Sequence, residues 1–162
     1  MKSIVIAAVL AFVVPFGSFG AEPATPSGSA DQERSSALFT SHFLRAFENL
    51  DLDRVMACFA PDATVFRPLP EPPELLDGRT AIREHFSKQF SAIRRASKAT
   101  SPPYLRLPAQ HLAVKILSSN SAVVTFELVN QERIARRTLV LIGTPNGWLI
   151  QHLHASNVPV QR

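Results

Sequence analysis

Apolar side chains in the first half of the chain recur every three or four residues, the spacing of one helix face. This pattern predicts a long first helix from Ser29, where Ser29 and Gln32 fit a capping box. Asp51 and Asp53 begin a second, shorter helix, and Thr80 is the expected N-cap of a third. The buried faces of the three helices are expected to hold Phe39, Phe43, Ala46, Phe47 and Leu50; Leu52, Val55, Met56 and Phe59; and Ile82, Phe86, Phe90 and Ile93.

The other apolar stretches are typical of strands. A short strand over 63–66 precedes a loop with four prolines, which cannot donate ladder hydrogen bonds. Apolar positions change parity near Pro108, and this predicts a β-bulge there. The chain is therefore expected to be an α+β domain with three N-terminal helices and a mainly antiparallel sheet. Its four long strands are predicted over 105–117, 122–129, 134–142 and 148–155.

Both faces of these long strands carry apolar residues. An antiparallel sheet with one face in water alternates cleanly between apolar and polar positions. Val123 and Val129 share one parity, while Val124, Phe126 and Leu128 share the other. Three helices can cover only one face, so a second copy of the chain is expected to cover part of the other. The predicted assembly is a homodimer through the outer face of the sheet.

The N-terminus has the pattern of a cleavable signal peptide over residues 1–20. Lys2 precedes an uncharged apolar stretch, and Ser18 and Gly20 are the small residues expected before cleavage at Ala21. Pro15 and Gly17 interrupt the stretch too early for a membrane anchor. We expect a periplasmic or secreted protein with no membrane association after cleavage. Its predicted parts are a disordered leader over 21–28, one domain over 29–158 and a tail over 159–162.

Charge and cysteine content exclude some classes of protein. The full chain has a net charge of +4, and its basic pairs at 94–95 and 136–137 are separated and not interleaved with aromatic residues. Nucleic-acid binding usually needs a concentrated basic stripe, so no nucleic-acid partner is expected. The single cysteine, Cys58, cannot form an internal disulfide, and its apolar neighbours indicate a core position.

Three local motifs resemble those of one superfamily. Phe59-Ala-Pro-Asp-Ala63 is similar to an F-x-x-D-A motif, and residues 78–82 resemble a G-x-x-A-I motif that opens a helix. The segment from Trp148 through His152 and His154 to Ser156 resembles a W-x-x-x-H-x-H-x-S strand. These motifs, with the order of elements, resemble the nuclear transport factor 2-like superfamily. The likeness is strongest to the SnoaL-like group and the association domain of calmodulin-dependent kinase II.

The resemblance implies a cone-shaped α+β barrel, in which a curved sheet wraps around the helices and leaves a pocket at its open end. It does not imply one activity, because members include isomerases, dehydratases, hydrolases, hubs and binding proteins. Enzymes of the superfamily place carboxylates inside the cone. Only Glu127 and Glu132 lie in or between the four C-terminal strands here, and this shortage argues against carrying over those mechanisms.

Arg137 is the leading candidate for a ligand anchor. Arg136 and Arg137 are adjacent on a strand, so one faces inward and the other outward. Arg137 is the closer match to a pocket arginine of the kinase hub, and a planar guanidinium suits a carboxylate or phosphate. The alternative is an ion pair between Arg137 and Glu127. The full predicted set of ligand-binding residues is Arg137, Thr125, Glu127, His152, His154 and Phe66.

His152 and His154 point to the same face of their strand, and with Glu127 they are the candidate catalytic residues for proton transfer. A His-x-His pair can also bind zinc, but a catalytic zinc needs a third protein ligand and no sequence neighbour supplies one. The sequence therefore predicts no metal and no cofactor. It favours an exported protein that binds a small anionic or amphipathic molecule. Two alternatives stay open: an isomerase, dehydratase or hydrolase of the same fold, and a structural, oligomerising domain.

Overall fold

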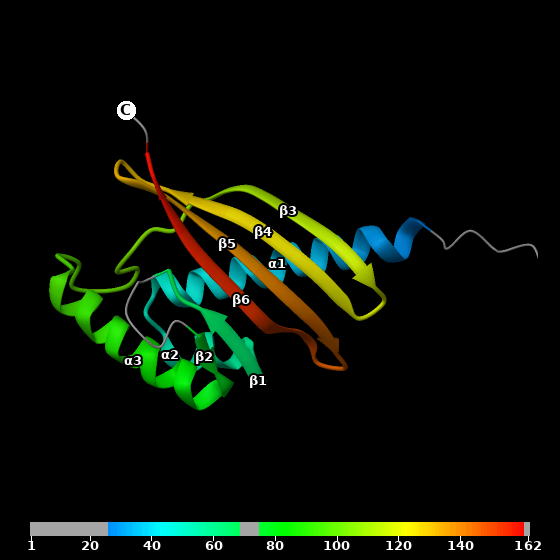
Figure 1. Cartoon of the computed structure of the whole chain (residues 1–162), viewed down its shortest axis with the longest axis horizontal. Helices are drawn as coiled ribbons and strands as arrows, with labels where there is room; N and C mark the ends of the chain where they lie inside the picture. Colours follow the sequence, from blue (N-terminus) through cyan, green and yellow to red (C-terminus); the bar gives the residue numbers. More distant parts are fainter. Residues whose placement is uncertain (1–25, 69–74, 161–162) are drawn as a thin grey trace, which may run out of the picture.

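The computed structural model describes residues 26–68 and 75–160, which form three helices and six strands (Figure 1). The helices are α1 (Pro26–Glu48), α2 (Leu52–Ala57) and α3 (Gly78–Ala96). The strands are β1 (Phe59–Phe66), β2 (Leu75–Asp77), β3 (Ala109–Ser118), β4 (Ser121–Val129), β5 (Arg133–Thr144) and β6 (Gly147–Pro159).

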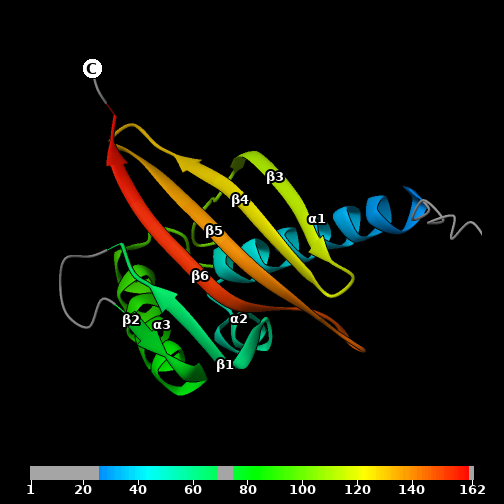
Figure 2. The ribbon, with the colours of Figure 1, turned by 45° about the vertical axis from the view of Figure 1, so that its right-hand side comes forward.

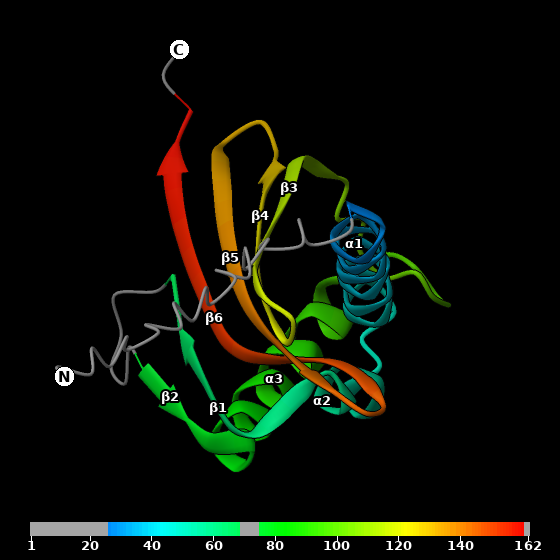
Figure 3. The same cartoon turned by 90° about the vertical axis from the view of Figure 1, so that its right-hand side faces the viewer.

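The six strands form one mixed sheet in the order β2-β1-β6-β5-β4-β3. Only the pair of β1 with β6 is parallel; the other neighbouring pairs are antiparallel (Figure 2). The sheet bends strongly around the helices, with α1 lying along β3 and β4 and α3 packed on β1 and β2 (Figure 3). The sheet stays open between its edges β2 and β3. The structure confirms the α+β architecture, as an open cone of helices packed on a curved sheet.

The first helix begins earlier than its sequence predicts. It starts at Pro26, and proline is well tolerated in the first turn of a helix because its missing N–H has no partner there. Ser29 therefore lies inside α1, so the capping box expected at Ser29 and Gln32 was wrong. The helical spacing itself is confirmed, since Phe43, Ala46 and Leu50 are buried.

Of the N-caps predicted for the other two helices, one is confirmed and one is wrong. The Asp51 side chain accepts a hydrogen bond from the Arg54 N–H, which confirms it as the cap of α2. The third helix begins at Gly78, so Thr80 is already helical and does not cap it. Its buried face follows the predicted spacing. Edge-to-face contacts join its phenylalanines to those of α1, with Phe47 and Phe90 centroids 4.9 Å apart.

The β-bulge lies later than expected. β3 begins at Ala109 rather than at Leu105, and its register with β4 shifts between Gln110 and Ala113. His111 has φ of +52° at this point, a left-handed conformation that one type of bulge uses. Leu105 and Leu107 precede the strand. The Leu107 N–H donates to Glu48 Oε1 at 2.6 Å, and this bond holds the segment against the end of α1.

Several expectations concern the ends of the domain. Residues 26–28 are helical and Pro159 is in β6, so these two elements continue past the predicted boundaries at 29 and 158. Residues 1–25, with the predicted signal peptide, lie outside the described residues, and export stays a prediction. Within the described residues, no helix is long and apolar enough to span a membrane. Cys58 is half-buried against the core, as its neighbours indicated.

Candidate functional site

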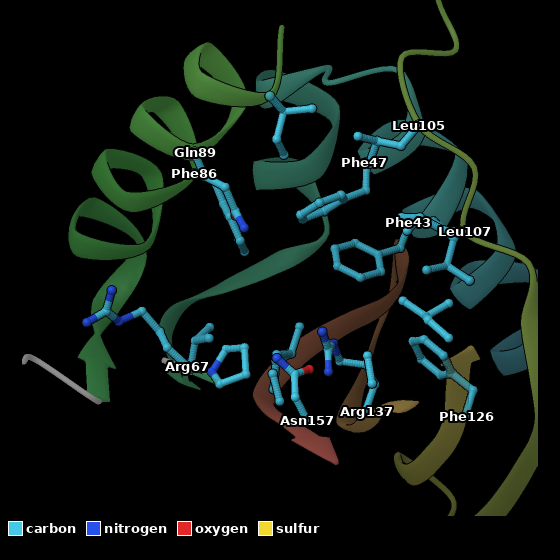
Figure 4. A pocket seen from close by; sticks show the side chains of 18 of the residues that line it. Phe43, Phe47, Arg67, Phe86, Gln89, Leu105, Leu107, Phe126, Arg137 and Asn157 are labelled. Carbon is cyan, nitrogen blue, oxygen red and sulfur yellow. The ribbon is translucent and has the colours of Figure 1, made fainter. Parts of the chain in front are cut away.

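A cavity of about 310 Å³ lies between the concave face of the sheet and helices α1 and α3 (Figure 4). Most of its wall is apolar and comes from these elements and from the segment before β3. The apolar lining residues are Phe43, Leu44, Phe47, Val65, Pro68, Phe86, Ile93, Leu105, Leu107, Phe126, Leu128, Ala135, Leu153 and Ala155. The polar lining residues are Arg67, His85, Gln89, Arg133, Arg137 and Asn157. No carboxylate is among the lining residues that the structure describes.

Strand alternation places Arg137 in this cavity. Alternate residues of a strand face the same side of a sheet, and Arg133, Ala135 and Arg137 of β5 all line the cavity. In the register of the sheet, Arg137 lies opposite Phe126 of β4 and Ala155 of β6, which also line it. The sequence-based choice of Arg137 over Arg136 as the inward residue therefore agrees with its position.

The guanidinium of Arg137 is half-buried and has no acidic partner among the described residues. Its Nη1 donates to the carbonyl oxygens of Arg136 at 2.7 Å and Ser156 at 3.1 Å. Burial lowers the pKa of Arg137, and the nearby charge of Arg133 lowers it further. The ion pair of Arg137 with Glu127, the alternative considered from the sequence, does not form. Glu127 lies 3.5 Å from Arg136 Nε instead.

Two amide side chains in the cavity wall have buried acceptors without donors. Asn157 Oδ1 and Gln89 Oε1 are both inaccessible to solvent, and neither has a hydrogen-bond partner. Asn157 follows Ala155 on the inward face of β6, and Gln89 projects from α3. In Figure 4 Asn157 lies beside Arg137, while Gln89 lies near Phe86.

His85 is the imidazole of the cavity wall in the described part of the chain. Its pKa is lowered mainly by burial, and then by the charges of Arg67 and Lys88. This lowering favours the neutral form of the ring. Arg67, Arg133 and Arg137 are the basic residues among the described lining residues.

The other predicted ligand-binding residues lie on the opposite face of the sheet. Thr125, Phe66 and His154 belong to one row across the sheet, and His152 belongs to the next row. The two rows are Leu75, Phe66, His154, Thr138, Thr125 and Ala113, and Asp77, Thr64, His152, Val140, Val123 and Lys115. Their neighbours Val65, Leu153 and Val124 are the buried residues that face the helices. The expectation that Thr125, Phe66, His152 and His154 line the pocket was therefore wrong.

The two histidines form a small cluster with residues of β1. Thr64 Oγ1 and His152 Nδ1 are 2.7 Å apart, and the ring of Phe66 lies 5.6 Å from that of His152 and 5.8 Å from that of His154. Burial and the charge of His154 lower the pKa of His152. Among the described residues, no group of three or more His, Cys, Asp and Glu side chains could hold a metal ion.

Glu127 also lies on the outer face, where it cannot act as a base in an apolar cavity. Its Oε2 is 3.0 Å from His111 Nδ1, and the pKa of Glu127 is lowered, chiefly by this hydrogen bond. The sequence argument expected an apolar cavity to raise that pKa. The proton-transfer mechanism built on Glu127, His152 and His154 is not supported by these positions.

Sequence reasoning missed five polar residues of the cavity: Arg67, His85, Gln89, Arg133 and Asn157. Strand parity could have found two of them. Arg133 shares the parity of Arg137, and Asn157 shares that of Leu153 and Ala155. His85 and Gln89 are four residues apart on α3, beside the predicted buried stripe. No sequence signal marks Arg67.

The fold agrees with the comparison against protein families. The family model described as "SnoaL-like domain" matches residues 37–161, so the chain belongs to the SnoaL-like domain family. No protein of curated function matches it in sequence.

The solved structures that resemble it include nuclear transport factor 2-like proteins. One of unknown function from Pseudomonas putida KT2440 has 16% identity and a TM-score of 0.63, over 78% of this chain and 87% of that one. A proposed dehydratase from Streptomyces avermitilis has 19% identity and a TM-score of 0.65, over 83% and 99%. A proposed calcium/calmodulin-dependent kinase II association domain from Thiobacillus denitrificans has 22% identity and a TM-score of 0.58, over 78% and 96%. At these identities the likeness establishes the fold.

Proposed function

We propose that this SnoaL-like protein binds a small amphipathic anion, a carboxylate with an apolar body, in the cavity between sheet and helices. One observation carries the proposal: the Arg137 guanidinium faces an apolar cavity and has no carboxylate partner among the described residues. Its bonds to the carbonyl oxygens of Arg136 and Ser156 orient the side chain but leave its positive charge uncompensated.

A carboxylate would gain more binding free energy from Arg137 than from an arginine in water. Hydrogen bonds between ionised groups are about twice as strong as neutral ones, and the guanidinium fork can engage both carboxylate oxygens. Burial that lowers the pKa of Arg137 also weakens the competition from water. A bound anion would offset the cost of burying the charged form of Arg137.

The rest of the lining favours an apolar body of limited size. Fourteen of the twenty lining residues are apolar, so the wall would bury a hydrocarbon chain or ring. The volume of about 310 Å³ is at the lower end of the range for small-molecule pockets. At about 30 Å³ for a water-sized group, it holds on the order of ten non-hydrogen atoms. An eight-carbon acid is therefore a suitable probe.

Catalysis has weaker support than binding. Similar structures include a proposed dehydratase and a ketosteroid isomerase-like protein, but their likeness extends only to the fold. His85 is an imidazole in the cavity wall, and its lowered pKa favours the neutral form, which could accept a proton. One candidate base does not by itself define a reaction.

A thermal-unfolding experiment with three eight-carbon compounds tests the proposal. Octanoate, octanol and octylamine share their apolar body and differ in head-group charge. Octanoate at ten times its dissociation constant should raise the unfolding midpoint by about 4 °C, whereas octylamine should not raise it. The rise should disappear in Arg137→Ala and persist in Arg136→Ala, whose side chain is on the outer face. Equal shifts for all three compounds, or an unchanged shift in Arg137→Ala, would contradict the proposal.

A further inference from the structure

The two buried amide oxygens of the cavity wall indicate that the ligand carries a hydrogen-bond donor. A buried acceptor without a donor destabilises a protein, and native proteins contain few of them. Asn157 Oδ1 and Gln89 Oε1 are both of this kind, and both residues line the cavity. Neither oxygen is accessible to water, so the amide must turn towards the cavity to accept a donor from a ligand, and that hydrogen bond would remove the cost.

Asn157 is the acceptor closer to the predicted anchor. In the pairing of β5 with β6, Asn157 lies opposite Ala135, and Arg133 and Arg137 are the inward residues on either side of Ala135. Asn157 and Arg137 are therefore diagonal neighbours on the inward face. The backbone positions of such diagonal neighbours are about 7–8 Å apart across the two strands, a distance that long side chains can span. The two residues lie side by side in Figure 4.

The positive charges around Asn157 favour a neutral hydrogen-bond donor over a positively charged one. Arg133 and Arg137 flank it, and the charge of Arg133 is felt strongly enough at Arg137 to lower the pKa of that residue. An ammonium group placed at Asn157 Oδ1 would be repelled by both guanidinium groups, since like charges in a partly buried site interact strongly. A neutral O–H or amide N–H would satisfy the same oxygen without repulsion.

We infer that the ligand is a carboxylate with a neutral hydrogen-bond donor on the second or third carbon, which Asn157 Oδ1 accepts while Arg137 holds the carboxylate. Hydroxy acids and N-acyl amino acids with an apolar chain are the two chemical classes that fit. Free amino acids do not fit. This inference rests on the proposed function and narrows it from amphipathic anions in general to donor-bearing ones.

The test compares dissociation constants of four acids that share one chain: octanoate, 2-hydroxyoctanoate, 3-hydroxyoctanoate and 2-aminooctanoate. One of the hydroxy acids should bind about tenfold more tightly than octanoate, the equivalent of one satisfied buried hydrogen bond. 2-Aminooctanoate should bind more weakly than octanoate. In Asn157→Leu, which removes the acceptor, the hydroxy acid and octanoate should bind equally.

Gln89→Leu tells the two acceptors apart. It removes the other buried acceptor of the wall, on α3, so a preference that is lost in Gln89→Leu but kept in Asn157→Leu would assign the donor to Gln89 and contradict the inference. Leucine at either position replaces an unsatisfied amide with an apolar group of similar size, so both variants are expected to fold. Their unfolding midpoints without ligand check this directly.

The outcomes separate the two proposals. If octanoate and both hydroxy acids bind the wild-type chain equally, and binding still requires Arg137, this inference is wrong and the proposed function stands. If the preference persists in Asn157→Leu, the donor is recognised elsewhere and the inference is again wrong. If none of these acids binds the wild-type chain, both proposals fail.

Discussion

Phe126 of β4 and Arg137 of β5 are directly opposite each other in the sheet, and both side chains face the cavity. Phe126 is only 3% exposed, so Arg137 shares its wall with a fully apolar neighbour. Arg136, one residue away, faces the other side of the sheet, where it meets Glu127. Adjacent residues of β5 therefore differ in their partners. Arg136 has a carboxylate partner, and Arg137 has none among the described residues.

A structural arginine on α3 gives the first prediction. Arg79 Nη2 donates to the carbonyl oxygen of Met56 at 2.8 Å and so joins the start of α3 to the end of α2. Arg79→Met should lower the free energy of unfolding by about 1 kcal/mol, because this carbonyl loses its charged donor. Urea unfolding measures the change.

Arg83→Met is the control for that prediction. Arg83 pairs with Asp53 at 2.9 Å, but the Asp53 side chain is 86% exposed, and exposed ion pairs contribute little. The Arg83 variant should stay within about 0.5 kcal/mol of wild type. Equal losses of unfolding free energy in the two variants would show that the hydrogen bond from Arg79 to Met56 contributes no more than the exposed ion pair of Arg83.

Stability should decrease as the pH falls from 7.5 towards 5.5. The pKa values of His85 and His152 are lowered in the folded chain, from an ordinary value of 6.5. Below about pH 6.5 the unfolded chain therefore binds more protons than the folded one, and protonation favours unfolding. His152→Gln and His85→Gln should each reduce the slope of unfolding free energy against pH. Unchanged slopes in both variants would contradict this assignment.

The thiol of Cys58 should be unreactive in the folded chain. Burial raises its pKa to about 11, from an ordinary value of 9.0. At pH 8 its thiolate fraction, and with it its rate of alkylation, should be about a hundredfold below that of an exposed thiol. Iodoacetamide labelling followed by mass spectrometry should therefore be slow in buffer and fast in urea. Rapid labelling of the folded chain would show that the side chain is accessible.

The outer face of the sheet is the surface that we expect to form a homodimer. Phe66 and Leu75 are adjacent on it and are 40% and 42% exposed, next to His154 of β6. Light scattering at micromolar concentration should give twice the mass of one chain. Phe66→Glu should shift the protein to the mass of a single chain.

The control for the dimer is Leu38→Glu on α1. Leu38 is 57% exposed but lies away from the outer face of the sheet, so this variant should keep the dimer mass. If the wild-type protein has the mass of one chain, the prediction of a homodimer is wrong.

The sequence predicted the helices and the four long strands because their apolar spacing is strong and local. Asp51 was identified as a cap for the same reason, since its hydrogen bond reaches only three residues along the chain. The three residues of β2 follow a proline-rich stretch and have no periodicity of their own. They become a strand by pairing with β1, and this cannot be seen locally.

The faces of the strands were harder to assign than the strands themselves. Alternation divides each strand into two sets but does not say which set the helices cover, and both sets are apolar here. The pair His152 and His154 was therefore assigned to the pocket although Leu153 and Ala155 line it. The bulge at His111 and the register shift between Val140 and Leu141 depend on neighbouring strands, so the sequence pattern does not locate them.

Titration calorimetry of octanoate against three forms of the chain tests the central claim most directly. The forms are wild type, Arg137→Met and Arg136→Met, which remove adjacent charges on opposite faces of β5. We expect Arg137→Met to weaken binding at least tenfold, a loss of about 1.4 kcal/mol, and Arg136→Met to stay within twofold of wild type. Equal affinities in the two variants would contradict an anion site anchored by Arg137.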